Sequence, residues 1–103
     1  MKDRIIDATK LSFNNTKGLD SSYVNFQGCE AKVIRYAAHQ KIPAHRHTKP
    51  TMKVILKGRI EFADGVVTTG MLYKCGGWEY QGEATEETHV LLLQEPGTEV
   101  IPS

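Results

Sequence analysis

Two histidines separated by one residue, His45 and His47, are the side chains of this sequence best suited to chemistry. They lie between Pro43 and Pro50, and the β-rich run 51–57 follows directly. In an extended strand, residues i and i+2 point to the same face and lie about 6.6 Å apart. Both imidazoles can therefore reach one ion, and imidazole is a ligand for zinc, copper, iron and nickel. The pair predicts a metal-binding pocket without choosing the metal.

Length and charge bound the classes of protein to consider. The chain has 103 residues, the size of one ordinary domain, and a net charge of +1. Acidic and basic residues alternate, so the clustered Lys and Arg that bind a nucleic-acid backbone are missing. The aliphatic block 91–93 is far too short to span a bilayer, and the N-terminus resembles no signal peptide. We therefore expect a cytoplasmic protein with no nucleic-acid or membrane partner.

Short strand-like runs, separated by turn signals about every ten residues, make up most of the chain. Clear examples are 31–38, 51–57 and 88–94, and Asp64-Gly65 is a strong hairpin signal. No segment shows a convincing helical period, and we find no internal repeat or linker. This pattern is typical of an all-β sandwich or barrel, so the sequence predicts one all-β domain over residues 1–103.

The motifs in this order resemble those of the cupin superfamily. His45-x-His47, an apolar strand and Gly58 are similar to its first motif, in which a glutamate follows His-x-His and a glycine follows after six intervening residues. Residues 70–80 resemble the second motif, in which a glycine precedes a Pro-x-Gly-x-x-His turn. The resemblance covers roughly residues 30 to 95 and implies a double-stranded β-helix, or jelly-roll barrel.

The chain departs from the cupin motifs at two of the four expected metal ligands. Thr51 stands where the motif has its glutamate. Tyr80 stands near the second-motif histidine, or Gln81 does if no deletion follows Gly70. Among cupins, the segment His-Arg-His-Thr-Lys-Pro at residues 45–50 most resembles the motif of three-histidine iron dioxygenases, which also lack the glutamate. The resemblance implies a divalent transition metal (Fe, Zn, Ni or Mn) on the histidine pair and leaves the third ligand open.

The orientation of strand 51–57 decides the charge of the pocket. Thr51 and Lys53 share one face, whereas Met52, Val54 and Leu56 share the other. The spacing of the cupin motif predicts that the face with Lys53 points inward, which would give a positively charged pocket for an anionic substrate. The apolar side chains of the opposite face predict that this other face points inward and that Lys53 lies in solvent. A slip by one residue flips the whole strand, so both interpretations stay open.

Several apolar side chains are further candidates for the pocket wall or for ordinary core. They are Tyr36, Phe62, Met71 and Trp78. Cys75 is a candidate soft ligand only if the following glycines fold it inward. His39 is expected in a turn, where a left-handed φ is tolerated.

Three functions from different classes fit these residues. The first is a metal-dependent enzyme, a dioxygenase or a related activity on a small oxygenated substrate, with His45 and His47 as metal ligands. The second is a metal-free, small-molecule-binding sensor, which the two missing ligands favour. The third is an interaction module with a vestigial pocket. No catalytic residue can be assigned. Open sheet edges and an N-terminal arm over residues 1–25 predict a homodimer.

Overall fold

The computed structural model of the chain describes residues 5–8, 10–16, 18–26, 29–75, 80–94 and 97–102. All regular secondary structure in these ranges is β-strand, and no helix among them is long and apolar enough to cross a membrane. The strands are β1 (Asn14–Thr16), β2 (Leu19–Phe26), β3 (Cys29–Tyr36), β4 (Lys41–His47), β5 (Thr51–Lys57), β6 (Arg59–Phe62), β7 (Gly65–Thr68), β8 (Leu72–Cys75), β9 (Tyr80–Ala84), β10 (Thr88–Gln94) and β11 (Val100–Pro102).

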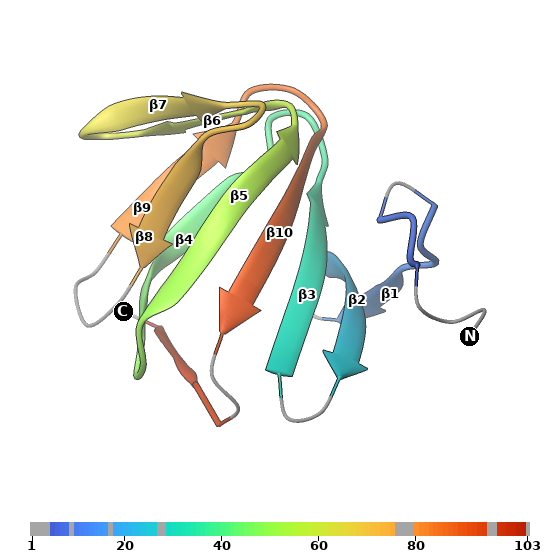
Figure 1. Ribbon diagram of the computed structural model, residues 1–103. Helices are drawn as coiled ribbons and strands as arrows, with labels where there is room; N and C mark the ends of the chain where they lie inside the picture. Colours follow the sequence, from blue (N-terminus) through green and yellow to red (C-terminus); the bar gives the residue numbers. More distant parts are fainter. Residues whose placement is uncertain are drawn as a thin grey trace.

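These strands form two antiparallel sheets that face each other (Figure 1). One sheet has the order β1-β2-β3-β10-β5-β8, and the other has the order β11-β4-β9-β6-β7. From β3 to β6 each strand lies in the opposite sheet from the one before it, and the same holds from β7 to β11. This crossing confirms the prediction of an all-β, double-sheet barrel of the jelly-roll type.

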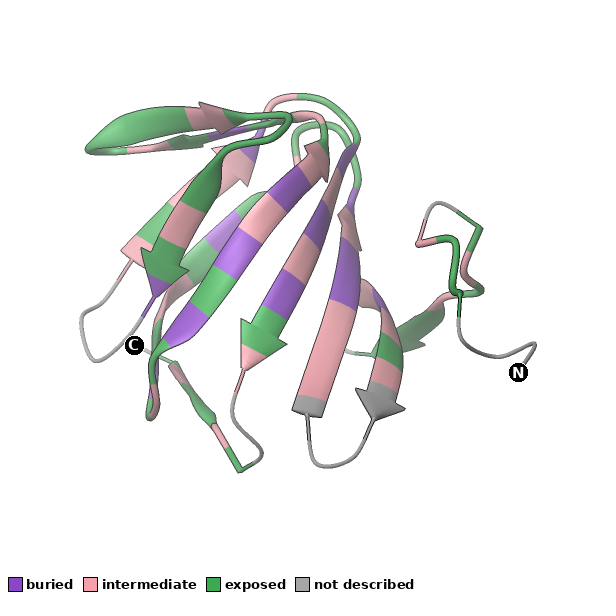
Figure 2. Cartoon of the chain, in the orientation of Figure 1, coloured by how far each residue is buried: buried purple, intermediate pink, exposed green. Residues whose placement is uncertain are grey.

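Buried residues alternate with more exposed ones along the central strands (Figure 2), and buried residues of both sheets form the core. In β5, Thr51, Lys53 and Ile55 are buried, whereas Met52 is 41% exposed. The motif spacing therefore gave the correct orientation of this strand, and apolarity gave the wrong one. The buried apolar cluster comprises Ile34, Tyr36, Ile42, Ile55, Ile60, Ala84, Val90 and Leu92. Each large aliphatic member contributes roughly 1.5–3 kcal/mol by leaving water.

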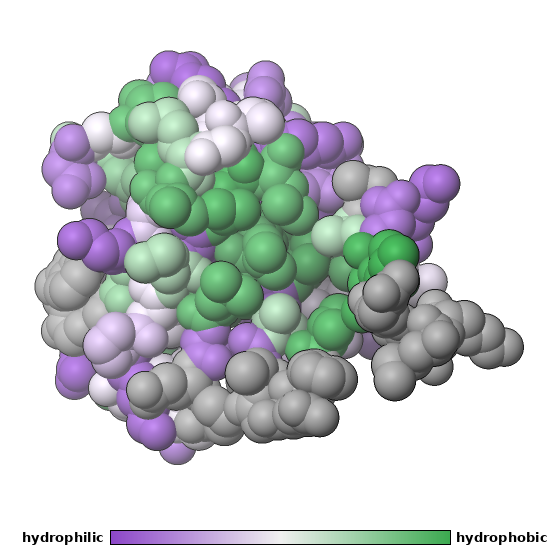
Figure 3. Space-filling view, viewed as in Figure 1, coloured by the Kyte–Doolittle hydropathy of each residue, from purple (hydrophilic) through white to green (hydrophobic). Residues whose placement is uncertain are grey.

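The outer face of the six-stranded sheet explains why the apolar residues of β5 predicted the wrong orientation of this strand. The register places Val54 between Leu91 and Leu72, and Met52 beside Leu93. Leu72 is 59% exposed and Leu93 is 52% exposed. Figure 3 shows these strands covered by a broad apolar surface. The apolar side of β5 thus belongs to an exposed sheet face and not to the core.

The N-terminal segment is only partly separate from the barrel. Strand β2 pairs with β3 of the same chain, so residues 19–26 belong to the barrel's own sheet. The Phe13 ring lies 4.4 Å from the Arg35 guanidinium carbon and packs edge-on against His89. Ile5, by contrast, is 78% exposed, in the segment that precedes β1 (Figure 1). The predicted turn at His39 is present, with a left-handed φ of 67°.

Candidate functional site

Three nitrogen atoms converge on the phenol oxygen of Tyr80. His45 Nε2 lies 2.7 Å from this oxygen, His47 Nε2 lies 2.9 Å from it, and Lys53 Nζ lies 2.8 Å from it. The histidines come from β4 and Tyr80 from β9, which are neighbours in one sheet, whereas Lys53 comes from β5 in the other. The cluster therefore ties the two sheets together inside the barrel.

The local course of β4 aims the two imidazoles. Its extended backbone puts His45 and His47 on one face, and His45 pairs directly with Tyr80 across the ladder to β9. The ladder is irregular between Ile42 and His45, where Pro43 has no N–H to donate. The Pro43 carbonyl instead lies 2.6 Å from His45 Nδ1 and fixes the ring. A carbonyl or carboxylate on the second nitrogen is typical of metal-ligating histidines.

The hydrogen-bond partners assign the protons of the cluster. A carbonyl only accepts, so His45 Nδ1 carries the proton and His45 Nε2 accepts the hydroxyl proton of Tyr80. His47 Nε2–H and the Lys53 ammonium then donate to the phenol oxygen. This arrangement leaves His47 Nδ1 as a buried acceptor with no partner in the described residues.

Burial keeps most of the cluster uncharged. It lowers the pKa of His45, and it lowers the pKa of His47 to about 4, with the charge of Lys53 adding to the effect. Burial raises the pKa of Tyr80, and the neighbouring Cys75 thiol adds to that rise. It also lowers the pKa of Lys53 to about 8, which leaves the amine mainly charged at neutral pH. The site thus holds two neutral imidazoles, a neutral phenol and an ammonium.

We expect this state of His47 to make the fold sensitive to mild acid. The unfolded chain protonates His47 near pH 6.5, whereas the folded chain does so near pH 4. The unfolded state therefore binds more protons in this window, and the free energy of unfolding should fall as the pH drops from about 6.5 to about 4. Urea titrations at several pH values should show a steeper fall for wild type than for His47→Gln. Equal slopes would contradict a buried neutral His47.

The structure places the other predicted site residues in different environments. Thr51 is 5% exposed, and its hydroxyl has no hydrogen-bond partner in the described ranges. Tyr36 is 5% exposed in the apolar core. Met71 lies on the surface, where its sulfur accepts hydrogen bonds from Thr68. Trp78 lies outside the described residues.

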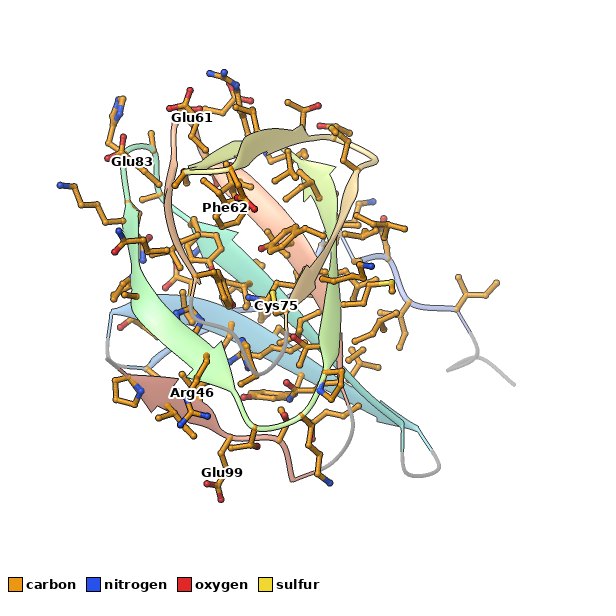
Figure 4. All side chains as sticks on the ribbon, turned by 90° about the vertical axis from the view of Figure 1, so that its left-hand side faces the viewer. Arg46, Glu61, Phe62, Cys75, Glu83 and Glu99 are labelled. Carbon is orange, nitrogen blue, oxygen red and sulfur yellow. The ribbon has the colours of Figure 1, made fainter. Side chains whose placement is uncertain are left out.

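Cys75 and Tyr73 join the interior from β8. Figure 4 shows Cys75 inside the barrel, and its side chain is 1% exposed. Tyr73 pairs with Lys53 in the ladder between β5 and β8, and its buried hydroxyl has no partner among the described residues. The sequence analysis missed Tyr73. Its position two residues before Cys75, and so on the same strand face, was the available signal.

A cavity of about 360 Å³ opens beside the cluster. Its lining includes Phe62, Tyr73, Tyr80 and the exposed Gln81. The Phe62 ring centroid lies 5.1 Å from that of Tyr73 and 6.1 Å from that of Tyr80. Aromatic rings thus form the wall between this cavity and the converging nitrogens.

The donor set fits a divalent transition metal on chemical grounds. Two neutral imidazole nitrogens aim at one point, which suits iron, zinc or nickel. No group of three or more His, Cys, Asp or Glu in the described part of the chain could hold a metal, and the third polar atom at this point is the Tyr80 oxygen. Its oxygen becomes a good ligand only when the phenol loses its proton.

Comparisons with known proteins bear on the fold. No protein-family model and no curated protein match the chain. An uncharacterized conserved protein from Klebsiella pneumoniae with a double-stranded β-helix domain is 13% identical, with a TM-score of 0.78 over 99% of this chain and 93% of that one. A Ralstonia eutropha protein with a cupin-like fold is 17% identical, with a TM-score of 0.62 over 75% of this chain and 54% of that one. This chain has a cupin fold.

The same cupin fold recurs in an enzyme of known activity. Salicylate 1,2-dioxygenase from Pseudoaminobacter salicylatoxidans is 8% identical, with a TM-score of 0.66 over 84% of this chain. The chain spans about half of the Ralstonia protein and 30% of the dioxygenase. At these identities the likeness concerns the fold alone, and function has to be argued from the site.

Proposed function

We propose that this cupin-fold chain binds a divalent transition metal (Fe, Zn, Ni or Mn) and acts on a small oxygenated substrate, as a dioxygenase or a related metal-dependent enzyme. The metal ligands are His45 Nε2, His47 Nε2 after its proton has moved to the buried Nδ1, and the deprotonated oxygen of Tyr80. The observation that carries the proposal is the approach of both Nε2 atoms to that single oxygen, at 2.7 and 2.9 Å. The dioxygenase among the cupin-fold structures supports the choice of chemistry.

Each side chain of the cluster has a role in this function. A bound divalent metal supplies a Lewis acid for a substrate oxygen and, if it is iron, redox chemistry with dioxygen. The Pro43 carbonyl holds His45 Nδ1–H and so directs Nε2 to the centre. Lys53 donates to the Tyr80 oxygen and stabilises the phenolate form against its protonated form. Phe62 and Tyr73 exclude water from the side facing the cavity.

Metal addition should stabilise the native state strongly. At a free metal concentration 100 times Kd, the gain is about 2.7 kcal/mol, or a rise in Tm of roughly 10 °C or more for a domain this size. Chelator-treated wild type should show this rise with at least one of the four metals. His45→Gln/His47→Gln should lose it, and His39→Asn/His89→Gln, which changes the two histidines outside the site, should keep it. A wild type that responds to none of the four metals would sink the proposal.

A second candidate function is metal-free binding of a small molecule, as in a sensor. The Lys53 ammonium favours it, because a cation 2.8 Å from the Tyr80 oxygen opposes a second cation at the same buried point. In this case the cavity beside Tyr80 binds an organic ligand, and the histidine–tyrosine hydrogen bonds stay in place. A ligand that raises the Tm in excess chelator, and equally without it, would distinguish this function from the first.

We further propose that the chain forms a homodimer through the exposed apolar face of the six-stranded sheet. Leu72 and Leu93 are more than half exposed there, beside Met52 and Val54. Such contiguous apolar surface is typical of interaction sites. Sedimentation velocity should show a dimer for wild type and a monomer for Leu72→Lys/Leu93→Lys. The control Val66→Lys, at an exposed position on β7, should remain dimeric. A monomeric wild type would contradict the proposal.

A further inference from the structure

We propose that Lys53 anchors the carboxylate of a small ligand with an apolar or aromatic body. The inference concerns the site of the proposed function and adds the class of ligand, but it does not require the metal. Lys53 is 2% exposed, and its only hydrogen bond in the described residues is the one it donates to Tyr80. An ammonium has three protons to donate, so two of them lack an acceptor there.

Lys53 has no carboxylate partner in the described part of the chain. Buried ammonium groups are normally paired with an anion, because an isolated buried charge is costly. No ion pair of Lys53 is present in the described ranges. Its neighbours include the Tyr73 and Tyr80 rings, whose centroids lie 5.6 and 5.2 Å from Nζ, and the buried Cys75, which acts to raise the pKa of Lys53 against the effect of burial. Ring faces compensate a cation only in part. A bound anion would complete the pairing.

Two buried hydroxyl groups next to Lys53 also lack partners. Thr51 Oγ1 belongs to the next inward-facing position of β5, and the Tyr73 hydroxyl belongs to the residue opposite Lys53 on β8. Neither has a hydrogen bond in the described part of the chain, although most buried polar atoms in proteins are paired. A carboxylate is an acceptor-only group with about four lone-pair sites. A carboxylate bound to Lys53 would have acceptor sites left for such hydroxyl groups, and unlike a neutral acceptor it would also balance the ammonium charge.

The adjacent cavity sets the size and character of the rest of the ligand. Its volume of about 360 Å³ is near the lower end of ligand pockets, which hold roughly 300–1,000 Å³. Phe62, Tyr73 and Tyr80 present aromatic rings to it. Tyr73 and Tyr80 line this cavity on one side and neighbour Lys53 on the other, so binding at Lys53 requires their rings to move apart when the carboxylate enters.

Calorimetric titration of chelator-treated protein with benzoate and butyrate tests this inference. Each acid is compared with its uncharged amide, which keeps the shape. We expect at least one acid to bind wild type at least tenfold more tightly than its amide. Lys53→Met should weaken that acid at least tenfold. Lys57→Met should change it less than twofold, because Lys57 is an exposed lysine of the same strand that does not line the cavity.

Three results would overturn the inference. They are equal affinity for acid and amide, no binding of either acid, and a loss of binding in Lys57→Met but not in Lys53→Met. The comparison of acid with amide uses wild type alone, so it decides the matter even if Lys53→Met does not fold. Repeating the titration on metal-loaded protein separates the two proposals. If the acid binds but no metal does, the carboxylate site is supported and the metalloenzyme proposal is contradicted. If a metal binds but no acid does, the metalloenzyme proposal is supported and the carboxylate site is contradicted.

Discussion

Replacing Tyr80 with phenylalanine is expected to destabilise the fold by about 3 kcal/mol or more, although only one oxygen is lost. That oxygen accepts from His47 and Lys53 and donates to His45. Each buried group left without its partner costs about 1–3 kcal/mol, and a charged group costs more. His47 is 3% exposed and Lys53 is 2% exposed, so water cannot readily replace the phenol. The substitution therefore removes a hydrogen-bond partner from His45, His47 and Lys53 at the same time.

Urea denaturation of Tyr80→Phe measures this loss, and two further variants test its cause. Tyr23→Phe makes the same chemical change at a tyrosine that is 55% exposed, and it should shift stability by less than about 0.5 kcal/mol. Adding Lys53→Met to Tyr80→Phe should restore part of the loss, because the unpaired ammonium is then absent. If Tyr80→Phe were as harmless as Tyr23→Phe, the hydrogen-bonded cluster would not exist in solution.

Replacing Gly58 with alanine is expected to cost about 3–5 kcal/mol or to prevent folding. Gly58 joins β5 to β6 with a φ of +108°, which side chains rarely adopt. A Cβ there would overlap Thr88 Oγ1 and would come within 2.7 Å of Glu87 O and of Thr88 Cα. Backbone atoms of this kind cannot move aside cheaply. Thr88 is itself fully buried and accepts a 3.0 Å hydrogen bond from Arg59 N, so displacing it disturbs the start of β6.

Gly70 provides a matched control for the Gly58 prediction. Its φ of +85° is also positive, but a Cβ there would meet no atom within 4 Å. Gly70→Ala should therefore carry only the backbone strain, about 1–2 kcal/mol. The difference between the two variants in urea denaturation measures the steric part. Equal losses would mean that Gly58 is needed only for its φ.

The sequence located several strands well because alternation and turn signals agree there. The runs 51–57 and 88–94 coincide with β5 and β10. Strand β9 (Tyr80–Ala84) has no comparable alternation, and a glycine stands at its centre. Gly82 belongs in this strand because a Cβ would come within 2.7 Å of Glu61 O and the Phe62 ring. Such close packing against β6 leaves no signal in local composition.

Only part of the candidate site could be predicted from the sequence. The spacing of His45 and His47 located its centre, because strand geometry alone puts both on one face. The inward position of Lys53 was undecided, since this end of the barrel has a polar interior and an apolar exterior, the reverse of the usual pattern. The unpaired Tyr73 hydroxyl depends on pairing between β5 and β8, which residue types do not reveal.

Metal content per chain tests the central claim most directly. The protein should be purified without a histidine tag, incubated with iron(II), zinc, nickel or manganese, freed of unbound metal and analysed for metal. We predict close to one ion per chain for wild type with at least one metal, and almost none for His45→Gln/His47→Gln. No bound metal in wild type, or an equal amount in the double variant, would contradict the claim that this histidine pair is a metal centre.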